Sequence, residues 1–387
     1  MSNKRCKTPS YISEQVLTNI LVKLPVKSLV RFMCVSKSWG HLIPSSSFIS
    51  THLMNARKHA PTYLVAFHQN SRDKRKIGYS LFCNETFEQY LELRLPSENG
   101  KHFGIYGSSN GLLCISTRIL VWRSQIEIWN PSVRKIRILP LIGLPQHPGA
   151  KYDIGLSFGF HPELNDYKVV RMLHFGQRLM DSFTVAVYSF STDSWWRIEV
   201  IPDWLKCPWQ YLGCEFWNGI AYWLIMKDSI VRIVSLDTDS EKFEQVVVPN
   251  TISSGSLCIK VYKESICLLQ VFLRRDGKKQ VNLWAMQEGS FEKLCFFVIY
   301  GEGSLPLCFR TDNELFVEDG DYRDGMADLV LYTLQSNQVR VNRTGIRLVL
   351  SRYGGLHFGS LYNCSANSYV ESLILLNDGR NAQLPYW

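Results

Sequence analysis

Residues 126–139 read IEIWNPSVRKIRIL, two short strand patterns joined by a polar turn. Apolar side chains alternate with polar ones in each half, as they do in strands that bury one face. Five further segments repeat this arrangement, and they begin at Tyr79, Val185, Val231, Val281 and Leu329. The repeated unit therefore predicts a β architecture for most of the chain.

The spacing of these repeats gives the size of one unit. The residue two before each turn is Ser80, Trp129, Tyr188, Val234, Trp284 or Tyr332, so successive copies lie 46 to 59 residues apart. A period near fifty is typical of kelch-like propeller blades, each of which has four strands. Because such a blade buries its faces only against its neighbours, the ring must close.

Closure is predicted from the strand count around the first repeat. Two strand-like stretches precede each later copy, but only one, residues 62–67, precedes the first. A single strand pattern, residues 369–376, remains after the last copy. We expect it to become the innermost strand of the first blade, which gives about six blades. A seventh stays open as an alternative in the long gap between Trp129 and Tyr188.

The first fifty residues follow a helical period instead. Apolar residues recur at steps of three and four, which predicts three helices at residues 12–24, 27–43 and 47–53. Ser13 is the expected N-cap of the first helix, and Pro25 ends it. A unit of about 45 residues buries little by itself, so we expect an apolar side that a partner covers. The fold class is therefore α+β overall, with a three-helix unit before an all-β propeller.

Composition narrows the class of protein. The 387 residues are 46% hydrophobic and 20% charged, as in a folded chain. No apolar run reaches the ~18 residues of a membrane-spanning helix, and no hydrophobic leader begins the chain. We therefore expect no membrane association. The net charge of +9 is best explained by a solvated surface, so we expect no nucleic-acid partner.

Patterns of enzymes and metal sites are missing from the sequence. The eleven cysteines form no C-x-x-C pair, which disfavours a zinc site and fits a reducing compartment. The nine histidines are isolated, and no G-x-x-x-x-G-K-[ST] motif occurs. We therefore predict no enzyme activity, no catalytic residue, no metal and no cofactor.

Two known domains resemble this chain. LPVKSLVRF (residues 24–32), CVSKSW (34–39) and FISTHL (48–53) resemble a plant F-box. GSSNGLLCI (107–115), IWNPSVRKIRILP (128–140), FGFHPELNDYKVVR (158–171), VYSFSTDSWWRI (187–198) and NGIAYWL (218–224) are similar to the F-box-associated, kelch-like domain of plant F-box proteins. The ending SYVESLILL (368–376) is similar to the S-locus F-box subfamily.

The resemblance implies the substrate-recognition subunit of a Skp–cullin–F-box ubiquitin ligase. Its partners would be a Skp-type adaptor, a cullin and an unidentified protein target. The S-locus subfamily would imply self-incompatibility, with a pistil ribonuclease as target. Such ribonucleases are often basic, and a chain of +9 would not attract one electrostatically. The implied location is the cytoplasm, with the nucleus as a second compartment.

The expected division of the chain is an F-box at residues 8–54, a linker at 55–61, a propeller at 62–377 and a tail at 378–387. The residues expected to share adaptor contact and core packing are Val16, Ile20, Leu24, Pro25, Leu29, Val35 and Trp39. The target-binding candidates, in a predicted connection rich in aromatic residues, are Trp204, Trp209 and Tyr211.

Two alternatives stay open at this point. The first is an F-box scaffold outside any ligase, because Tyr11–Ile12 stands where the family usually has Leu-Pro. The second is a propeller enzyme or carbohydrate-binding domain with an unrelated helical leader.

Overall fold

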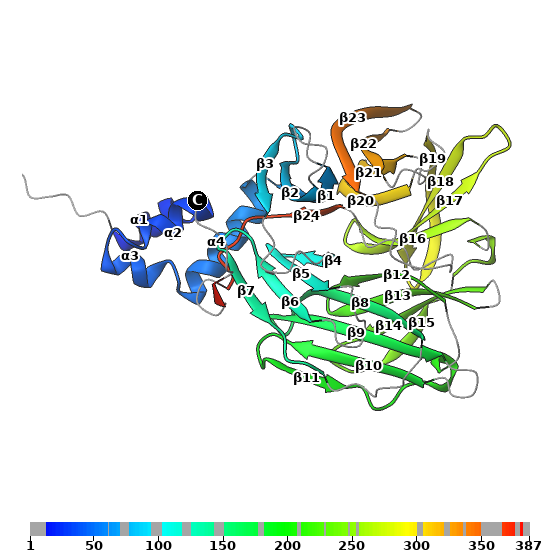
Figure 1. The fold of residues 1–387 in the computed structure, drawn as a ribbon, viewed down its shortest axis with the longest axis horizontal. Helices are drawn as coiled ribbons and strands as arrows, with labels where there is room; N and C mark the ends of the chain where they lie inside the picture. The colour runs from blue at the N-terminus through cyan, green and yellow to red at the C-terminus, as the bar shows by residue number, and fades with distance from the viewer. Residues whose placement is uncertain are drawn as a thin grey trace, which may run out of the picture.

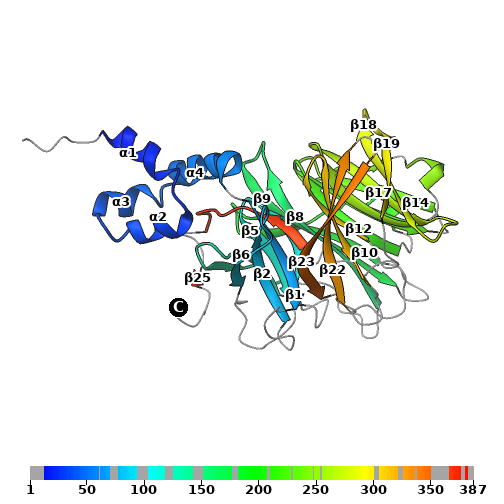
Figure 2. The same ribbon diagram turned by 90° about the horizontal axis from the view of Figure 1, so that it is seen from above.

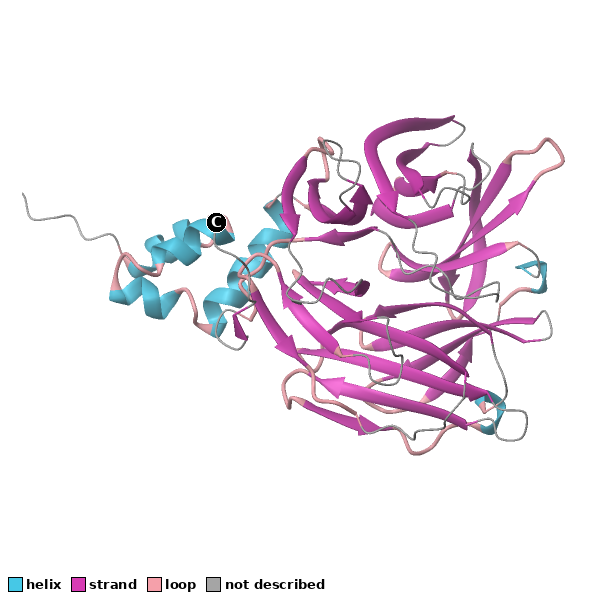
Figure 3. Ribbon diagram, in the orientation of Figure 1, coloured by secondary structure: helices cyan, strands magenta, loops and turns pink. Residues whose placement is uncertain are grey.

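The structure is a computed structural model of the 387-residue chain. It describes residues 13–60, 62–69, 77–93, 103–117, 125–142, 151–176, 182–206, 210–227, 230–246, 248–252, 255–299, 305–320, 326–335, 338–349, 366–375 and 380–381. Figure 3 shows the longer helices gathered at one end of the molecule, while strands with short helical turns among them fill the other. The predicted α+β class is confirmed.

Four α-helices begin the described part of the chain: α1 (Glu14–Leu21), α2 (Val26–Phe32), α3 (Lys37–Leu42) and α4 (Ser46–His59). The predicted N-cap is present, since the Ser13 side chain accepts a hydrogen bond from the Val16 amide. Ser36 and Ser45 cap α3 and α4 in the same way. We refer to residues 13–59 as the helical unit.

The helices differ from the prediction in two places. The single helix expected at residues 27–43 is divided, because Ser36 adopts an extended conformation and begins α3. The last helix continues to His59. Residues 55–59 of the expected linker therefore form the end of α4. The helical unit therefore runs directly into the first strand.

Within the described residues the strands group into six antiparallel blades of four strands, and a pairing of His68 with Leu348 joins the first and last blades into one eight-stranded sheet. Figure 1 shows the blades arranged around a common centre, with the helical unit to one side. From the centre outward, the first blade consists of β24 (Ala366–Tyr369), β1 (Tyr63–Gln69), β2 (Ile77–Cys83) and β3 (Gln89–Leu93), and the second of β4 (Phe103–Ser109), β5 (Leu112–Thr117), β6 (Ile126–Asn130) and β7 (Lys135–Ile138). The third blade consists of β8 (Lys151–His161), β9 (Asp166–Gly176), β10 (Ser182–Ser189) and β11 (Ser194–Arg197), and the fourth of β12 (Gln210–Trp217), β13 (Ile220–Lys227), β14 (Ile230–Asp237) and β15 (Phe243–Val246). The fifth blade consists of β16 (Ser256–Tyr262), β17 (Ser265–Leu273), β18 (Lys279–Gln287) and β19 (Ser290–Ile299), and the sixth of β20 (Leu305–Thr311), β21 (Glu314–Asp319), β22 (Met326–Gln335) and β23 (Gln338–Val349).

Short elements complete the fold. β25 (Arg380–Asn381) pairs with β7 at the outer edge of the second blade, within the segment expected to be a tail. Two 3-10 turns, η1 (Asp203–Leu205) and η2 (Asn250–Ile252), lie in connections between blades. Among the described residues, no helix is long and apolar enough to cross a membrane.

The ring closes in the first blade. β24 pairs with β1 antiparallel, with Tyr369 opposite Tyr63 and Ala366 opposite Ala66. The inner strands contact one another in the order β4, β8, β12, β16, β20 and β24, and β24 contacts β4 again. The predicted closure is therefore confirmed, but the strand lies at Ala366–Tyr369 rather than at residues 369–376.

Six apolar clusters fill the six spaces between adjacent blades. The repeat positions lie on the third strand of each blade and face the preceding blade. Trp129 packs between the first two blades, Tyr188 between the next two, and Tyr332 between the last two. Each blade is thus stabilised by burial against its neighbours.

The helical unit has its own core, which is completed by two residues from the propeller. Leu21, Leu29 and Phe48 are buried in this core together with Leu373, and Val133 packs against it. Leu373 belongs to residues 370–375, which follow β24 and which we call the strap. Figure 2 shows the helical unit beside the edge of the ring.

Candidate functional site

The helical unit exposes large apolar side chains at three of the predicted adaptor-binding positions. Val16 and Ile20 are 50% and 49% exposed, and they lie four residues apart on one face of α1. Val35, in the turn between α2 and α3, is 65% exposed. Such side chains are available to a partner without any rearrangement of the helices.

The other four predicted positions have different environments. Pro25 is exposed, whereas Leu24 and Trp39 are half-buried against the core of the helical unit. Leu29 is fully buried in that core, so it supports the helices instead of offering a contact surface. The exposed residue that sequence reasoning missed is Met54, on α4.

The strap joins the helical unit to the second blade. The Asn130 side-chain amide donates to the carbonyl oxygens of Ser372 (2.9 Å) and Ile374 (2.8 Å). The Tyr369 hydroxyl donates to Asn130 Oδ1 at 3.2 Å. These bonds explain how a segment outside the strand ladder is held in place, since its carbonyl groups find buried partners.

A second connection runs from α4 to the ring. The Arg57 guanidinium donates to Asn110 Oδ1, and Asn110 Nδ2 donates to the Tyr167 hydroxyl at 2.9 Å. Asn110 and Tyr167 are buried in the second and third blades. The helical unit is therefore held against the ring at two places.

A channel of about 590 Å³ passes through the centre of the ring, and residues of all six inner strands line it. Along β12 and the turn that follows, the lining runs from Tyr211 to Asn218, which corresponds to roughly 23 Å at ~3.3 Å per strand residue. Arg57 of α4 also lines this channel.

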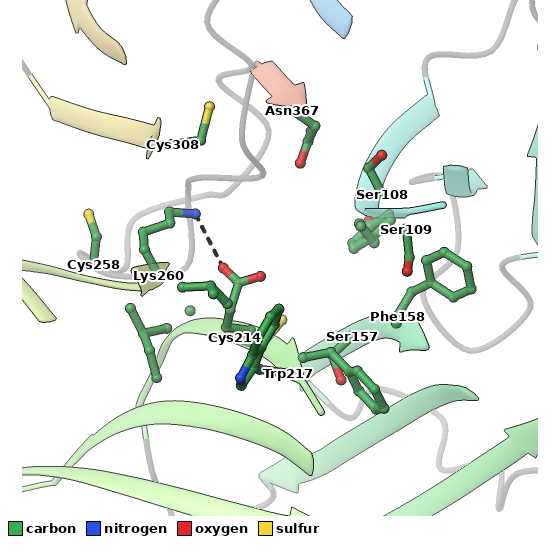
Figure 4. Close-up of a pocket in the computed structure, with 18 of the residues that line it drawn as sticks. Ser108, Ser109, Ser157, Phe158, Cys214, Trp217, Cys258, Lys260, Cys308 and Asn367 are labelled. Atoms are coloured by element: carbon green, nitrogen blue, oxygen red, sulfur yellow. Dashed lines mark ion pairs between the residues drawn. The ribbon is translucent and has the colours of Figure 1, made fainter. Parts of the chain in front are cut away.

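One ion pair lies in the channel wall (Figure 4). Lys260 Nζ of β16 is 3.8 Å from Glu215 Oε2 of β12, and the two side chains are 14% and 28% exposed. Burial raises the pKa of the Glu215 carboxyl, while the Lys260 ammonium opposes this shift. The wall thus holds two charged groups where water is restricted.

Polar and aromatic side chains surround this pair. Ser108, Ser109 and Asn367 line the channel from the first two blades, and Figure 4 shows them across the opening from Lys260. Ser157 is 1% exposed, and its Oγ has no hydrogen-bond partner in the described part of the chain. The aromatic lining includes Phe158, Tyr211 and Trp217.

Of the predicted target-binding residues that the structure describes, Tyr211 lines the channel and Trp204 does not. Trp204 lies in η1 at the surface, is 38% exposed and does not line the channel. Tyr211 is half-buried in the channel wall, and burial raises its pKa well above the usual range. Trp209 lies outside the described residues, as does Tyr11–Ile12.

The side chains that commonly bind metal ions do not cluster in the described ranges. No group of three or more His, Cys, Asp or Glu side chains there could hold a metal ion. Apart from Tyr211, the channel residues were missed by sequence reasoning, because they come from six distant segments. Most of them lie on the inner strands, each of which follows a connection between blades.

Comparisons with known proteins match both parts of the chain. The model of the F-box domain matches residues 10–51, and that of the F-box associated beta propeller domain matches residues 51–293, more than half of the chain. F-box protein CPR1 of Arabidopsis thaliana is 26% identical over 301 residues, which covers 72% of this chain and 70% of that protein.

Two further relatives from Arabidopsis thaliana extend this likeness. F-box/kelch-repeat protein At3g23880 is 22% identical and covers 96% of this chain and 97% of its own length. F-box protein At5g49610 is 28% identical and covers 63% and 66% respectively. The chain is similar to plant F-box proteins, and it belongs to the F-box-associated β-propeller family, with an F-box domain in front of the propeller.

Proposed function

We propose that this protein is the substrate-recognition subunit of a Skp–cullin–F-box ubiquitin ligase. The helical unit would bind a Skp-type adaptor, and the propeller would bind a protein target. The observation that carries this proposal is the exposed apolar face of α1, formed by Val16 and Ile20, on a unit that the F-box model matches. The proposed role is non-catalytic.

The attachment of the helical unit supports this role. Ubiquitin transfer by a separate enzyme requires that target and ligase stay close, and tethering raises their effective concentration. The strap and the Arg57–Asn110 bond hold the two binding parts of the chain in a fixed relation. A target on the ring would therefore be presented in a restricted orientation.

The proposal is tested by co-purification of the full chain with a Skp-type adaptor and a cullin. We expect the double variant Val16→Asp and Ile20→Asp to recover at least tenfold less adaptor, because a charge in the interface core opposes burial. Val200→Asp, at a residue 82% exposed on the ring, is the matched control and should recover as much adaptor as wild type. Equal recovery by the double variant contradicts the proposed surface.

The scaffold alternative has one sequence feature in its favour, Tyr11–Ile12 at the position of the usual Leu-Pro. It is distinguished by the same experiment. A ligase subunit recovers both adaptor and cullin, and it raises ubiquitination of a bound target in a reconstituted reaction. Recovery of the adaptor without a cullin would favour the scaffold.

The target and the compartment follow from this role as proposals. We propose a protein target met in the cytoplasm, with the nucleus as second compartment, which imaging of a fluorescent fusion tests. Proximity labelling with the proteasome blocked would identify the target. A ribonuclease among the labelled proteins would support the S-locus assignment. If no ribonuclease is labelled in pistil extracts, the result opposes that assignment.

A further inference from the structure

The positive charge of the chain is concentrated before the ring. Residues 1–59 contain nine Lys or Arg residues and one acidic residue, Glu14, whereas residues 60–387 contain 34 basic and 33 acidic residues. Nearly all of the net charge of +9 therefore belongs to the helical unit and the residues before it. A surface charged only for solubility mixes both signs, as the ring does, so the helical unit calls for another explanation.

We propose that the partner of the helical unit presents an acidic rim around an apolar centre, and that exposed cations of the unit attract this rim. Lys23, Arg31 and Lys37 are the residues assigned to this role. The inference rests on the proposed function, because the partner would be the Skp-type adaptor. It adds the charge of the adaptor surface and the residues that steer the encounter.

Each of these three cations lies within four residues of an exposed apolar side chain. Lys23 follows α1, and its amide donates to the Ile20 carbonyl oxygen at 3.2 Å. Arg31 lies in the last turn of α2, and the chain then passes through Val35 to Lys37, the first residue of α3. Protein interfaces commonly have an apolar core surrounded by a polar rim, and this arrangement matches that pattern.

The chain itself does not neutralise these three side chains. All three are exposed, and none of them forms an ion pair with another described residue. Lys27 differs, because it is attracted to Glu371 of the strap, and Arg57 differs, because it donates to Asn110. Lys27 and Arg57 therefore face the ring, whereas the three cations are available to a partner.

Exposed charges of this kind act mainly on the rate of association. Because each side chain stays hydrated, a single ion pair at the rim adds little affinity. Several like charges attract an oppositely charged surface before contact, and salt screens this attraction, with a Debye length of about 10 Å at 0.1 M. The expected signature is an association rate constant that falls with salt, while the dissociation rate constant changes little.

A nucleic acid is the other anionic partner that a basic surface can attract. The exposed apolar side chains of Val16, Ile20 and Val35 oppose it, because they offer no hydrogen bond to phosphate groups. A protein surface accounts for both features of the helical unit. Its apolar centre covers the apolar side chains, and its carboxylates meet the cations.

The test measures association of the full chain with a purified, fluorescently labelled Skp-type adaptor by stopped flow at 50 and 500 mM NaCl. We expect the wild-type association rate constant to fall about tenfold over this range, because screening removes the attraction. The combined variant Lys23→Gln, Arg31→Gln and Lys37→Gln should associate about fivefold more slowly at 50 mM NaCl and show a weaker dependence on salt.

The matched control removes the same charge from the ring. It combines Arg197→Gln, Lys242→Gln and Arg275→Gln, at three exposed residues of different blades. Because these residues lie outside the helical unit, the control should associate within about twofold of wild type at both salt concentrations. Circular dichroism checks that the variants are folded, and the salt dependence of wild type tests the inference without any substitution.

Four results would overturn the inference. They are a wild-type association rate constant that does not change with salt, one that rises with salt as it would for a basic adaptor surface, an equal loss in the ring control, and a duplex oligonucleotide bound by wild type but not by the combined variant. If the adaptor is still recovered by wild type and lost by the Val16→Asp and Ile20→Asp variant, the charge inference alone fails. No recovery of the adaptor by wild type contradicts the proposed function, and the inference with it.

Discussion

Leu29 and Val35 lie on the same helical pattern, yet their side chains have opposite environments. Leu29 is fully buried and Val35 is 65% exposed. The helical pattern expected at residues 27–43 includes both residues, but it does not reveal which one serves the core and which one a partner. Of the seven predicted adaptor positions, burial now separates Leu29 from Val16, Ile20 and Val35.

This difference gives a stability prediction. Leu29→Ala should lower the free energy of unfolding of the helical unit by about 2–5 kcal/mol, because it leaves a cavity in the core. Val35→Ala, the matched control, should change it by less than ~0.5 kcal/mol. Urea unfolding followed by the helical circular dichroism signal measures both. Similar midpoints for the two variants would contradict the core assignment of Leu29.

Glu127 gives a pH prediction. Its side chain is 6% exposed, and burial raises the pKa of its carboxyl from 4.5 to about 7. The folded state therefore holds the proton more tightly than the unfolded state, so the stabilising contribution is complete below pH 4.5 and is lost as pH rises through 7. The loss amounts to at most ~3.5 kcal/mol at ~1.4 kcal/mol per pH unit.

Glu127→Gln removes this dependence. The midpoint temperature of wild type should fall relative to that of the variant between pH 5 and pH 8. Thermal unfolding of both proteins at several pH values measures the difference between their midpoint temperatures. The other titrating groups are the same in both proteins, so their contributions cancel in this difference. Parallel midpoints across this range would show that Glu127 does not act as described.

At the scale of elements, the helical period predicted where helices lie but not where one ends and the next begins. Residues 27–43 keep an apolar face throughout, so the pattern contains no break. The break is made by one side chain, because Ser36 caps α3 by accepting from the Trp39 amide at 3.2 Å. A capping serine inside a long pattern is the signal that would have divided it.

The last strand shows a similar limit. Residues 369–376 alternate like a strand, but only Tyr369 of them pairs in the ladder of β1. From Val370 onward the strap bonds to Asn130 instead, a contact between residues more than 200 positions apart. Local pattern therefore predicted the closing strand but could not predict where the chain leaves it.

The strap gives a prediction at this scale. Asn130→Ala removes the donor to Ser372 and Ile374, and each buried carbonyl left unpaired costs about 1–3 kcal/mol. Amide hydrogen exchange within residues 371–375 should become at least tenfold faster. Asn19→Ala, at an exposed residue of α1, is the control and should leave this exchange unchanged. Unchanged exchange in Asn130→Ala would show that other contacts hold the strap.

For the whole molecule, the repeat predicted the number of blades and the closure of the ring. The six apolar clusters between adjacent blades explain why this prediction succeeded. Each repeat forms a blade that can bury its apolar faces only against the two neighbouring blades. The channel could not be predicted. Its Lys260 and Glu215 are ordinary charges in the sequence, and only the ring brings their strands together.

A truncation tests this arrangement. A chain ending at residue 365 lacks β24 and the strap, so the first blade loses its inner strand and the helical unit loses Leu373. We expect broad unfolding and at least tenfold lower adaptor recovery. A chain ending at residue 376 keeps both features and should unfold as cooperatively as wild type. Equal behaviour of the two chains would contradict the role given to closure.

The position of Leu373 also sets an order of events during synthesis. At ~5–20 residues per second, this side chain leaves the ribosome tens of seconds after α2 has been made. Until then the helical unit lacks one wall of its core. An interrupted chain therefore displays helices that are incompletely assembled, and only translation beyond the strap yields a finished docking module.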